Sequence, residues 1–387
     1  MLNFECIKPD YDTRSIVNLM ASVGRGLQSP ETAYAPLPEL DPALVANARH
    51  VVLLVFDGLG YNYLEHRATL LRRFLKGRMT SVFPSSTAPA ITTFMSGVAP
   101  QQHGVSGWFM NLRECGAVVM LLPFRPRCGG PPLSGLCAKT LIDAPSFFDA
   151  LPIAAYYLMQ HELRDSHYSI ATAGAARRLA YRDLDDYFYT IAKTIRSSRQ
   201  RAYIYAYWPL FDALSHRHGV ASIQTAAHFQ ELERGFGTLV NSLAGTDTLL
   251  IATADHGFVD TAPEYIVHLR DHPQLSECLS LPLCGEPRAA YAYVRPAKTR
   301  FFERYVSEKL NNYCTMYPAA EFLDMGWFGL GEATPRLAER IGDYVLLTKN
   351  RCAIKDALPM ESDWRDIGVH GGVSADEMYV PLIVAQC

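Results

Sequence analysis

The sequence predicts an α/β protein with a mostly parallel central sheet that is flanked by helices. Three apolar runs, 51–56, 202–208 and 248–253, have the unbroken aliphatic, β-branched and aromatic character of strands that are covered on both faces. Helical periodicity over 184–197 and about 222–243 lies before and between the last two runs. Because strands that alternate with helices build parallel sheets, this order favours the α/β class.

Three further elements complete the expected sheet and its helices. A shorter strand is predicted at about 78–83, and a helix is predicted to follow it from about 88 to 97. The last strand is predicted at 379–384 and contains Pro381. Because proline has no N–H to donate, we expect this strand to lie at an edge or to start late.

Two segments interrupt the alternation of strands and helices. Residues from about 108 to 180 are rich in proline and glycine loops, and residues from about 263 to 341 contain short elements, with a strand at 290–294 and a helix at 300–311. We therefore expect a single α/β domain over residues 1–387, with a smaller cap or insertion formed by these segments.

Composition excludes several classes of protein. Of 387 residues, 49% are hydrophobic and 19% are charged, so the chain can build a large core and is not disordered throughout. The net charge of −3, without a basic stripe, argues against a stable nucleic-acid partner. Nine scattered cysteines form no C-x-x-C motif. With no long apolar run and no signal-like start, we expect a cytoplasmic protein without a membrane span; the oligomeric state stays open.

Acidic and histidine side chains gather at the ends of the predicted strands. The carboxyl ends of parallel strands meet at one edge of a sheet, where ligands bind. Mixed oxygen and nitrogen donors at such an edge suit zinc, with manganese as the alternative. The candidate ligands are Asp57, Asp212, His216, Asp255, His256 and His370.

Hydroxyl groups stand at the start of the helix that is predicted from about 88. Ser85, Ser86 and Thr87 lie between the preceding strand and this helix. The N-terminus of a helix stabilises anions, and a hydroxyl beside a divalent cation becomes a better nucleophile. The plainer explanation is N-capping, for which serine and threonine are favoured in any helix.

Taken in order, these motifs resemble the alkaline phosphatase superfamily and, within it, the type I phosphodiesterase/nucleotide pyrophosphatase family. The resemblance extends from residue 51 to 384. The matching motifs are Val-Phe-Asp57-Gly58, Phe83-Pro84-Ser-Ser-Thr87-Ala-Pro89, Gln102-His103-Gly104, Asp212-Ala-Leu-Ser-His216, Ala254-Asp255-His256-Gly257 and Val369-His370-Gly371-Gly372.

The resemblance implies an alkaline-phosphatase-like core with two divalent metal ions, expected to be zinc. It implies that Thr87 is the nucleophile and that a phospho-threonine forms during hydrolysis of a phosphodiester or phosphoanhydride bond in a small molecule or nucleotide. It also implies two sets of ligands, which are Asp212, His216 and His370 for one metal and Asp57, Asp255 and His256 for the other, next to Thr87.

The sequence departs from the family at two positions. Ala90 stands where the family usually has an asparagine after the proline. A second asparagine of the family, which binds a phosphate oxygen, would fall near Trp108 in this chain. The backbone N–H of Ala88 is therefore a candidate donor to that oxygen. Ser86 is the neighbouring alternative to Thr87 as nucleophile. His218 is a secondary candidate for contact with the substrate or with a metal ligand.

Three functions remain open from the sequence. A metal-dependent phosphodiesterase or nucleotide pyrophosphatase is favoured, because no arginine stands beside Thr87 to pair with the dianion of a monoester. The alternative is a phosphomonoesterase, phosphonate hydrolase or phosphomutase on the same scaffold. In that case the cap would supply a cation, with these candidates: Arg125, Arg127, Arg270 and Arg288. The third function is a metal-binding protein without catalysis.

Overall fold

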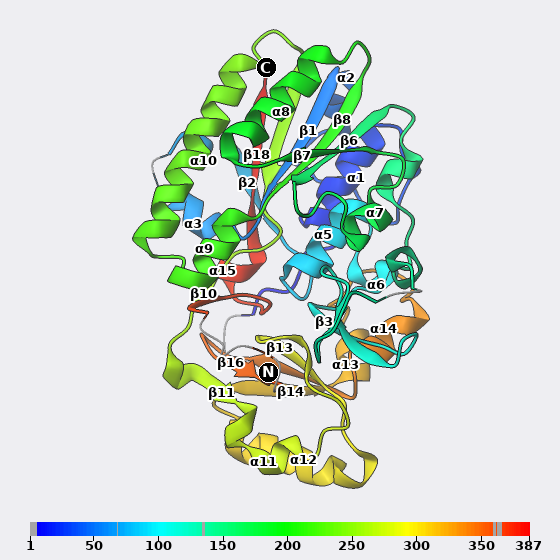
Figure 1. Ribbon diagram of the computed structural model, residues 1–387, viewed down its shortest axis with the longest axis vertical. Coiled ribbons are helices and arrows are strands. Elements are labelled where there is room, and N and C mark those ends of the chain that lie inside the picture. Colours follow the sequence, from blue (N-terminus) through cyan, green and yellow to red (C-terminus); the bar gives the residue numbers. More distant parts are fainter. Residues whose placement is uncertain (1–5, 68, 134–135, 359–360, 362–365) are drawn as a thin grey trace.

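A seven-stranded sheet forms the centre of the protein. The computed structural model describes residues 6–67, 69–133, 136–358, 361 and 366–387. Within this described part, the main sheet has the strand order β2-β18-β9-β1-β8-β6-β7 (Figure 1). Its strands are β1 His50–Phe56, β2 Leu75–Thr80, β6 Ala154–Gln160, β7 Arg177–Tyr181, β8 Ala202–Trp208, β9 Thr248–Thr253 and β18 Tyr379–Gln386.

Parallel pairing dominates this sheet. Strands β9, β1, β8, β6 and β7 run parallel to one another, whereas β18 pairs antiparallel with both β2 and β9. Every residue of β1, β8 and β9 is buried, as expected for strands that are covered on both faces. The α/β class and the mostly parallel sheet predicted from the sequence are confirmed.

Helices cover the sheet in two groups. Helix α10 packs against α8 and α9, and in the second group α5 packs against α1 and α7 (Figure 1). The α-helices of the described chain are α1 Ile16–Gly26, α2 Pro42–Asn47, α3 Tyr61–Glu65, α4 Leu70–Arg73, α5 Thr87–Ser96, α6 Pro100–His103, α7 His167–Thr172, α8 Leu184–Ser197, α9 Leu210–His218, α10 Ile223–Ser242, α11 Pro273–Ser276, α12 Thr299–Tyr305, α13 Ala319–Asp324, α14 Pro335–Arg340 and α15 Ala375–Met378.

Two alternatives were open for the last strand, an edge position and a late start, and the edge position is wrong. Strand β18 lies between β2 and β9, so it has a neighbour on each side. The ladder with β9 begins only at Ile383, two residues after Pro381, and Pro381 itself is paired with Arg78 of β2. Proline is tolerated here because its missing N–H lies ahead of the second ladder.

A second sheet lies at the other end of the molecule, in the lower half of Figure 1. Its order in the described residues is β14-β15-β13-β12-β3-β4-β5, and its pairs are antiparallel. The strands are β3 Phe109–Leu112, β4 Ala117–Met120, β5 Arg125–Pro126, β12 Cys284–Glu286, β13 Ala289–Ala292, β14 Cys314–Pro318 and β15 Tyr344–Thr348. Two-stranded pairs are β10 Val259–Asp260 with β17 Gly368–Val369, and β11 Ile266–His268 with β16 Ala353–Lys355.

The segments expected to form a cap are divided between the two sheets. The beginning of the segment from about 108 to 180 supplies β3, β4 and β5 to the second sheet, whereas its end supplies β6 and most of β7 to the main sheet. The segment from about 263 to 341 supplies β12, β13 and β14 to the second sheet. The division of the chain into one domain with cap segments stays a prediction.

The helices also bear on membrane insertion. Among the described residues, none of the helices combines the length and the apolar character that a membrane crossing requires.

Candidate metal centre

Three neighbouring strands carry the acidic residues to one edge of the main sheet. Asp57 directly follows β1, and Asp255 lies two residues after β9. Asp212 lies in the first turn of α9, which begins just after β8. Because β9, β1 and β8 are adjacent and parallel, their carboxyl ends bring these three carboxylates together.

The first cluster consists of Asp57, Asp255 and His256, and all three side chains are buried. One ligand atom from each residue lies within 4.8 Å of the others. The Nε2 atom of His256 is 3.4 Å from Oδ1 of Asp57 and 3.5 Å from Oδ2 of Asp255. Two carboxylate oxygens and an imidazole nitrogen therefore face one point.

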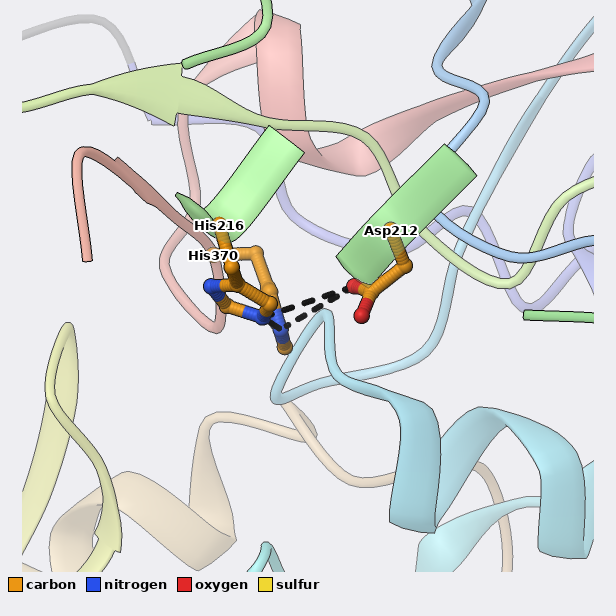
Figure 2. Close-up of side chains that lie close together, drawn as sticks. All are labelled: Asp212, His216 and His370. Atoms are coloured by element: carbon orange, nitrogen blue, oxygen red, sulfur yellow. Dashed lines mark hydrogen bonds and ion pairs between the residues drawn. The ribbon is translucent and has the colours of Figure 1, made fainter. Parts of the chain in front are cut away.

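The second cluster consists of Asp212, His216 and His370 (Figure 2). Asp212 and His216 are four residues apart on α9, so they lie on one face of the helix, and the loop before β18 brings in His370. Oδ1 of Asp212 is 3.5 Å from Nε2 of His216 and 3.8 Å from Nε2 of His370. Figure 2 shows the carboxylate facing both imidazoles.

The two clusters adjoin each other. The imidazoles of His256 and His370 stack with ring centroids 3.7 Å apart. Nε2 of His256 is also 4.0 Å from Oδ1 of Asp212 in the second cluster. The structure thus brings all six ligand candidates of the sequence into one centre with two halves.

Backbone carbonyls orient the histidines of this centre. Nδ1 of His216 is 2.9 Å from the oxygen of Gly368, and Nδ1 of His370 is 3.2 Å from the oxygen of Ser85. A carbonyl only accepts, so each Nδ1–H donates and each Nε2 keeps its lone pair. The lone pairs point at the atoms of the clusters, as metal coordination requires.

Hydrogen-bond donors hold one oxygen of Asp255 and one oxygen of Asp57. Oδ1 of Asp255 accepts 3.0 Å hydrogen bonds from the N–H groups of Gly58 and His256. Oδ2 of Asp57 accepts from the hydroxyl of Tyr207. Within this centre, three buried carboxylate oxygens make no hydrogen bond to any described residue: Oδ1 of Asp57, Oδ1 of Asp212 and Oδ2 of Asp255. These three atoms are the ones that face the histidine Nε2 atoms, so the residues fit divalent cations.

Electrostatics also favours cations here. Burial, and then the charges of Asp212 and Asp255, raise the pKa of Asp57 well above its usual range. Burial likewise raises the pKa of Asp212. Burial and the neighbouring histidines lower the pKa of His370, which keeps its imidazole neutral. Anionic carboxylates crowded in a buried place, beside neutral imidazoles, are stabilised when cations bind between them.

Thr87 stands at the boundary between the first cluster and a cavity. It is the first residue of α5, and its Oγ1 is 3.1 Å from Nε2 of His256. The side chain is buried, with 7% of the residue exposed, yet it lines the cavity. A hydroxyl in this place contacts both the first cluster and any molecule in the cavity.

The cavity beside the centre has a volume of about 330 Å³. Metal-ligand candidates form part of its wall. The start of α5, the second sheet, β16 and the chain around β17 supply the other lining residues. The lining residues are Ser86, Thr87, Trp108, Phe109, Asp212, His216, Glu286, Pro287, Lys355, Asp366, Val369 and His370. Its size suits a small molecule.

Sequence reasoning missed Glu286 and Lys355 as residues of the cavity wall, and it missed the hydroxyl of Tyr207 as a donor to Asp57. Burial raises the pKa of Glu286 to about 7, although the nearby Ser86 hydroxyl and Trp108 N–H act in the opposite direction. Oε1 of Glu286 accepts from the N–H of Trp108 at 2.7 Å. None of the three stands in a recognisable motif; only the place of Tyr207 near the end of a predicted strand could have drawn attention to it.

The remaining predicted residues lie apart from the cavity. His218 is half-buried at the end of α9 and does not line the cavity. Ala88 is buried in the first turn of α5, and its side chain does not line the cavity either. The proposed arginines are elsewhere: Arg125 and Arg270 are exposed, Arg127 pairs with Glu361 at 2.8 Å, and Arg288 pairs with Glu377 at 2.6 Å.

A family model described as type I phosphodiesterase/nucleotide pyrophosphatase matches residues 51–372. The chain belongs to this family, as the motifs indicated. No curated protein sequence matches the chain.

Solved structures share the fold. Murine ectonucleotide pyrophosphatase/phosphodiesterase 5, in an inactive form in complex with AMP, has a TM-score of 0.67 and 17% identity, with 86% of this chain and 87% of that chain covered. The human enzyme has a TM-score of 0.66 and 16% identity over the same shares. Phosphonoacetate hydrolase from Sinorhizobium meliloti, in complex with phosphonoformate, has a TM-score of 0.62 and 17% identity, covering 87% and 90%.

Proposed function

We propose that this protein is a two-metal phosphoric diester hydrolase that acts on a small phosphodiester or nucleotide through a phospho-threonine. The observation that carries the proposal is the position of Thr87, whose Oγ1 is 3.1 Å from Nε2 of His256 and borders the cavity. Two further observations support it: the chain belongs to the family, and the carboxylate oxygens of the centre that make no hydrogen bond to a described residue suit cations.

Each half of the centre would hold one metal ion, for which zinc suits the oxygen and nitrogen donors and manganese is the alternative. Asp212, His216 and His370 would hold one ion, and Asp57, Asp255 and His256 would hold the other. When bound, the ions would supply electrostatic stabilisation of the attacking and leaving oxygens.

Thr87 performs the covalent step. Its Oγ1 forms a bond to phosphorus while the bond from phosphorus to the leaving oxygen breaks. The hydroxyl proton passes to solvent, and the leaving oxygen takes up a proton. Water then cleaves the bond between phosphorus and Thr87, which restores the hydroxyl and releases the phosphate product.

A phosphonate or monoester hydrolase is the second candidate. Among the described residues that line the cavity, Lys355 alone carries a lysine or arginine charge. Burial lowers the pKa of Lys355. Nearby acidic residues raise it in part, and Glu361 has the largest such effect. A lysine in the cavity would favour a substrate that carries a second anionic group, as a phosphonate or a monoester does. The fold of this chain is also shared with a phosphonate hydrolase.

Substrate preference separates these candidates. The measurement is kcat/KM for an aryl nucleotide diester, p-nitrophenyl phosphate and phosphonoacetate, with zinc or manganese added to metal-free protein. We expect the diester to be preferred at least tenfold, about 1.4 kcal/mol in transition-state terms. A tenfold preference for either of the other two substrates would reverse the ranking.

Thr87→Ala tests the nucleophile. We expect kcat to fall by three orders of magnitude or more while metal content is retained, because nucleophile and metals act as a unit. Mass spectrometry of acid-quenched wild-type protein should find phosphate on Thr87. Near-normal turnover of Thr87→Ala with metals bound would instead implicate Ser86 or a direct attack by water.

A further inference from the structure

The start of α5 presents hydrogen-bond donors that the protein itself does not use. Thr87 and Ala88 are the first two residues of this ten-residue helix, and Pro89, the third, has no N–H. Among the described residues, no acceptor is bonded to the N–H of Thr87 or of Ala88. Free N–H groups at the positive end of a helix favour an anion.

Ser86 adds a hydroxyl to these donors. It is the N-cap residue of α5 and is fully buried, but its side chain makes no capping hydrogen bond. An N-cap serine usually accepts from the second or third N–H of its helix, and here the third residue is Pro89. Among the residues that the structure describes, the buried Oγ has no hydrogen-bond partner, although Ser86 lines the cavity.

Glu286 is the nearest competitor for this hydroxyl. The Ser86 hydroxyl lies close enough to lower the pKa of Glu286, against the larger effect of burial, yet no hydrogen bond of normal geometry joins the two. Glu286 already accepts from the N–H of Trp108. The Ser86 hydroxyl is thus available to a molecule in the cavity.

Building on the proposed phosphoryl transfer, we infer that the Ser86 hydroxyl donates a hydrogen bond to a non-bridging oxygen of the phosphoryl group that Thr87 attacks. The ligand is a tetrahedral phosphate or phosphonate oxyanion, and the N–H of Ala88 is the second donor. Ser86 thereby stabilises the phosphate oxygen in place of an asparagine side chain, which this chain has neither at Ala90 nor at Trp108. Ser86 is a catalytic residue in the sense that it contacts the reacting group.

Ser85 provides a matched control next in the sequence. It is equally buried, but its hydroxyl donates to the oxygen of Gly372 at 2.7 Å. Ser85→Ala and Ser86→Ala remove the same atom one residue apart. The first substitution removes a structural hydrogen bond, and the second removes the donor that we assign to the substrate.

The test compares a phosphodiester with its two phosphorothioate diastereomers, in which sulfur replaces one non-bridging oxygen. Ser86→Ala should lower kcat/KM for the oxygen ester by about 100-fold or more, the usual effect of losing one such donor. Sulfur is a poor hydrogen-bond acceptor, so replacing the oxygen that faces Ser86 should slow the wild-type protein more than the variant. For that one diastereomer, the ratio of the phosphodiester rate to the phosphorothioate rate should therefore be smaller in Ser86→Ala. Ser85→Ala should leave this ratio unchanged.

Two further readouts separate binding from stability. Metal content should stay at the wild-type level in Ser86→Ala, whereas binding of orthovanadate, an oxyanion probe, should weaken at least tenfold. An unchanged ratio for both diastereomers, or unchanged vanadate binding, would overturn the role of Ser86 even if Thr87 becomes phosphorylated. If the wild-type protein forms no phosphate ester on Thr87, the proposed function fails and the role of Ser86 fails with it.

Discussion

At the scale of single residues, two of the acidic metal-ligand candidates, Asp255 and Asp57, are held in the same way. Asp255 uses one oxygen to accept two backbone N–H groups and leaves the other without a partner. Asp57 does the same, with Tyr207 as the donor. Fixing one oxygen sets the direction of the other, so little reorganisation is needed when a cation binds.

Tyr207→Phe should weaken metal binding to the half formed by Asp57, Asp255 and His256. The substitution removes the hydroxyl that orients Asp57 and leaves the ring in place, so we expect a 10- to 100-fold loss of affinity. Competition with a chelating dye measures this. Tyr205→Phe is the control, because the buried Tyr205 hydroxyl makes no hydrogen bond to any residue in the described part of the chain. Equal affinities in both variants would contradict the assignment.

Glu286 makes the stability of the metal-free protein depend on pH. Its folded pKa of about 7 lies above the ordinary 4.5, so the fold favours the protonated form and loses stability as pH rises from about 4.5 through 7. Glu286→Gln removes this loss. In metal-free protein, the variant should gain up to about 3 kcal/mol relative to wild type between pH 5 and pH 8. A stability difference that does not change with pH, measured by urea unfolding, would refute this.

At the scale of elements, a buried ion pair holds the loop of His370 against the second sheet. Arg288, between β12 and β13, bonds the Glu377 carboxylate through Nε at 2.6 Å and through its terminal nitrogen at 2.8 Å. The same carboxylate accepts from the N–H of Gly372 at 2.8 Å. A side chain at Gly372 would lie 2.9 Å from both ion-pair partners. At Gly372, the last residue of the histidine motif, any larger residue would therefore have to displace one of these two partners.

Breaking this pair should be costly. Glu377→Gln leaves the guanidinium of Arg288 buried without its counter-ion, and such losses are about 3–5 kcal/mol. Removal of the exposed pair between Arg113 and Glu339, with Glu339→Gln, should cost below about 1 kcal/mol. Thermal unfolding of both variants gives the comparison. Similar losses in the two would show that the buried pair does not clamp the loop.

At the scale of the whole molecule, the centre depends on segments that are far apart in the chain. The main sheet contributes the ligand candidates that follow β1, β8 and β9. The second sheet closes the cavity with Phe109 and Glu286, while β16 brings Lys355. Cations bound at the centre would therefore tie the two parts of the fold together.

Removal of metal should destabilise the protein. A ligand present at 1,000 times its Kd stabilises the fold by about 4 kcal/mol, and here it would also relieve repulsion among buried carboxylates. We expect two metal ions per chain by elemental analysis and a lower thermal midpoint after chelation. Zinc should restore the midpoint, whereas magnesium, which prefers oxygen ligands, should not. An identical midpoint before and after chelation would exclude a bound metal.

The sequence by itself determined the elements of the core and the composition of the centre. Strands 202–208 and 248–253 are local apolar runs, and the structure has them with the same bounds. Asp57, Asp212 and Asp255 closely follow three such runs, and parallel pairing of β1, β8 and β9 brings them to one edge of the sheet. These features depend on a few consecutive residues, which is why the pattern was sufficient.

Only the tertiary structure decided which other side chains reach the centre. Glu286 and Lys355 come from short strands without a motif, and Tyr207 shares its pattern with the core residue Tyr205. Pro381 was expected at an edge because its missing N–H is a local property, whereas the start of the ladder with β9 depends on a distant strand. Contacts between remote segments depend on the packing of the whole chain, so local periodicity does not predict them.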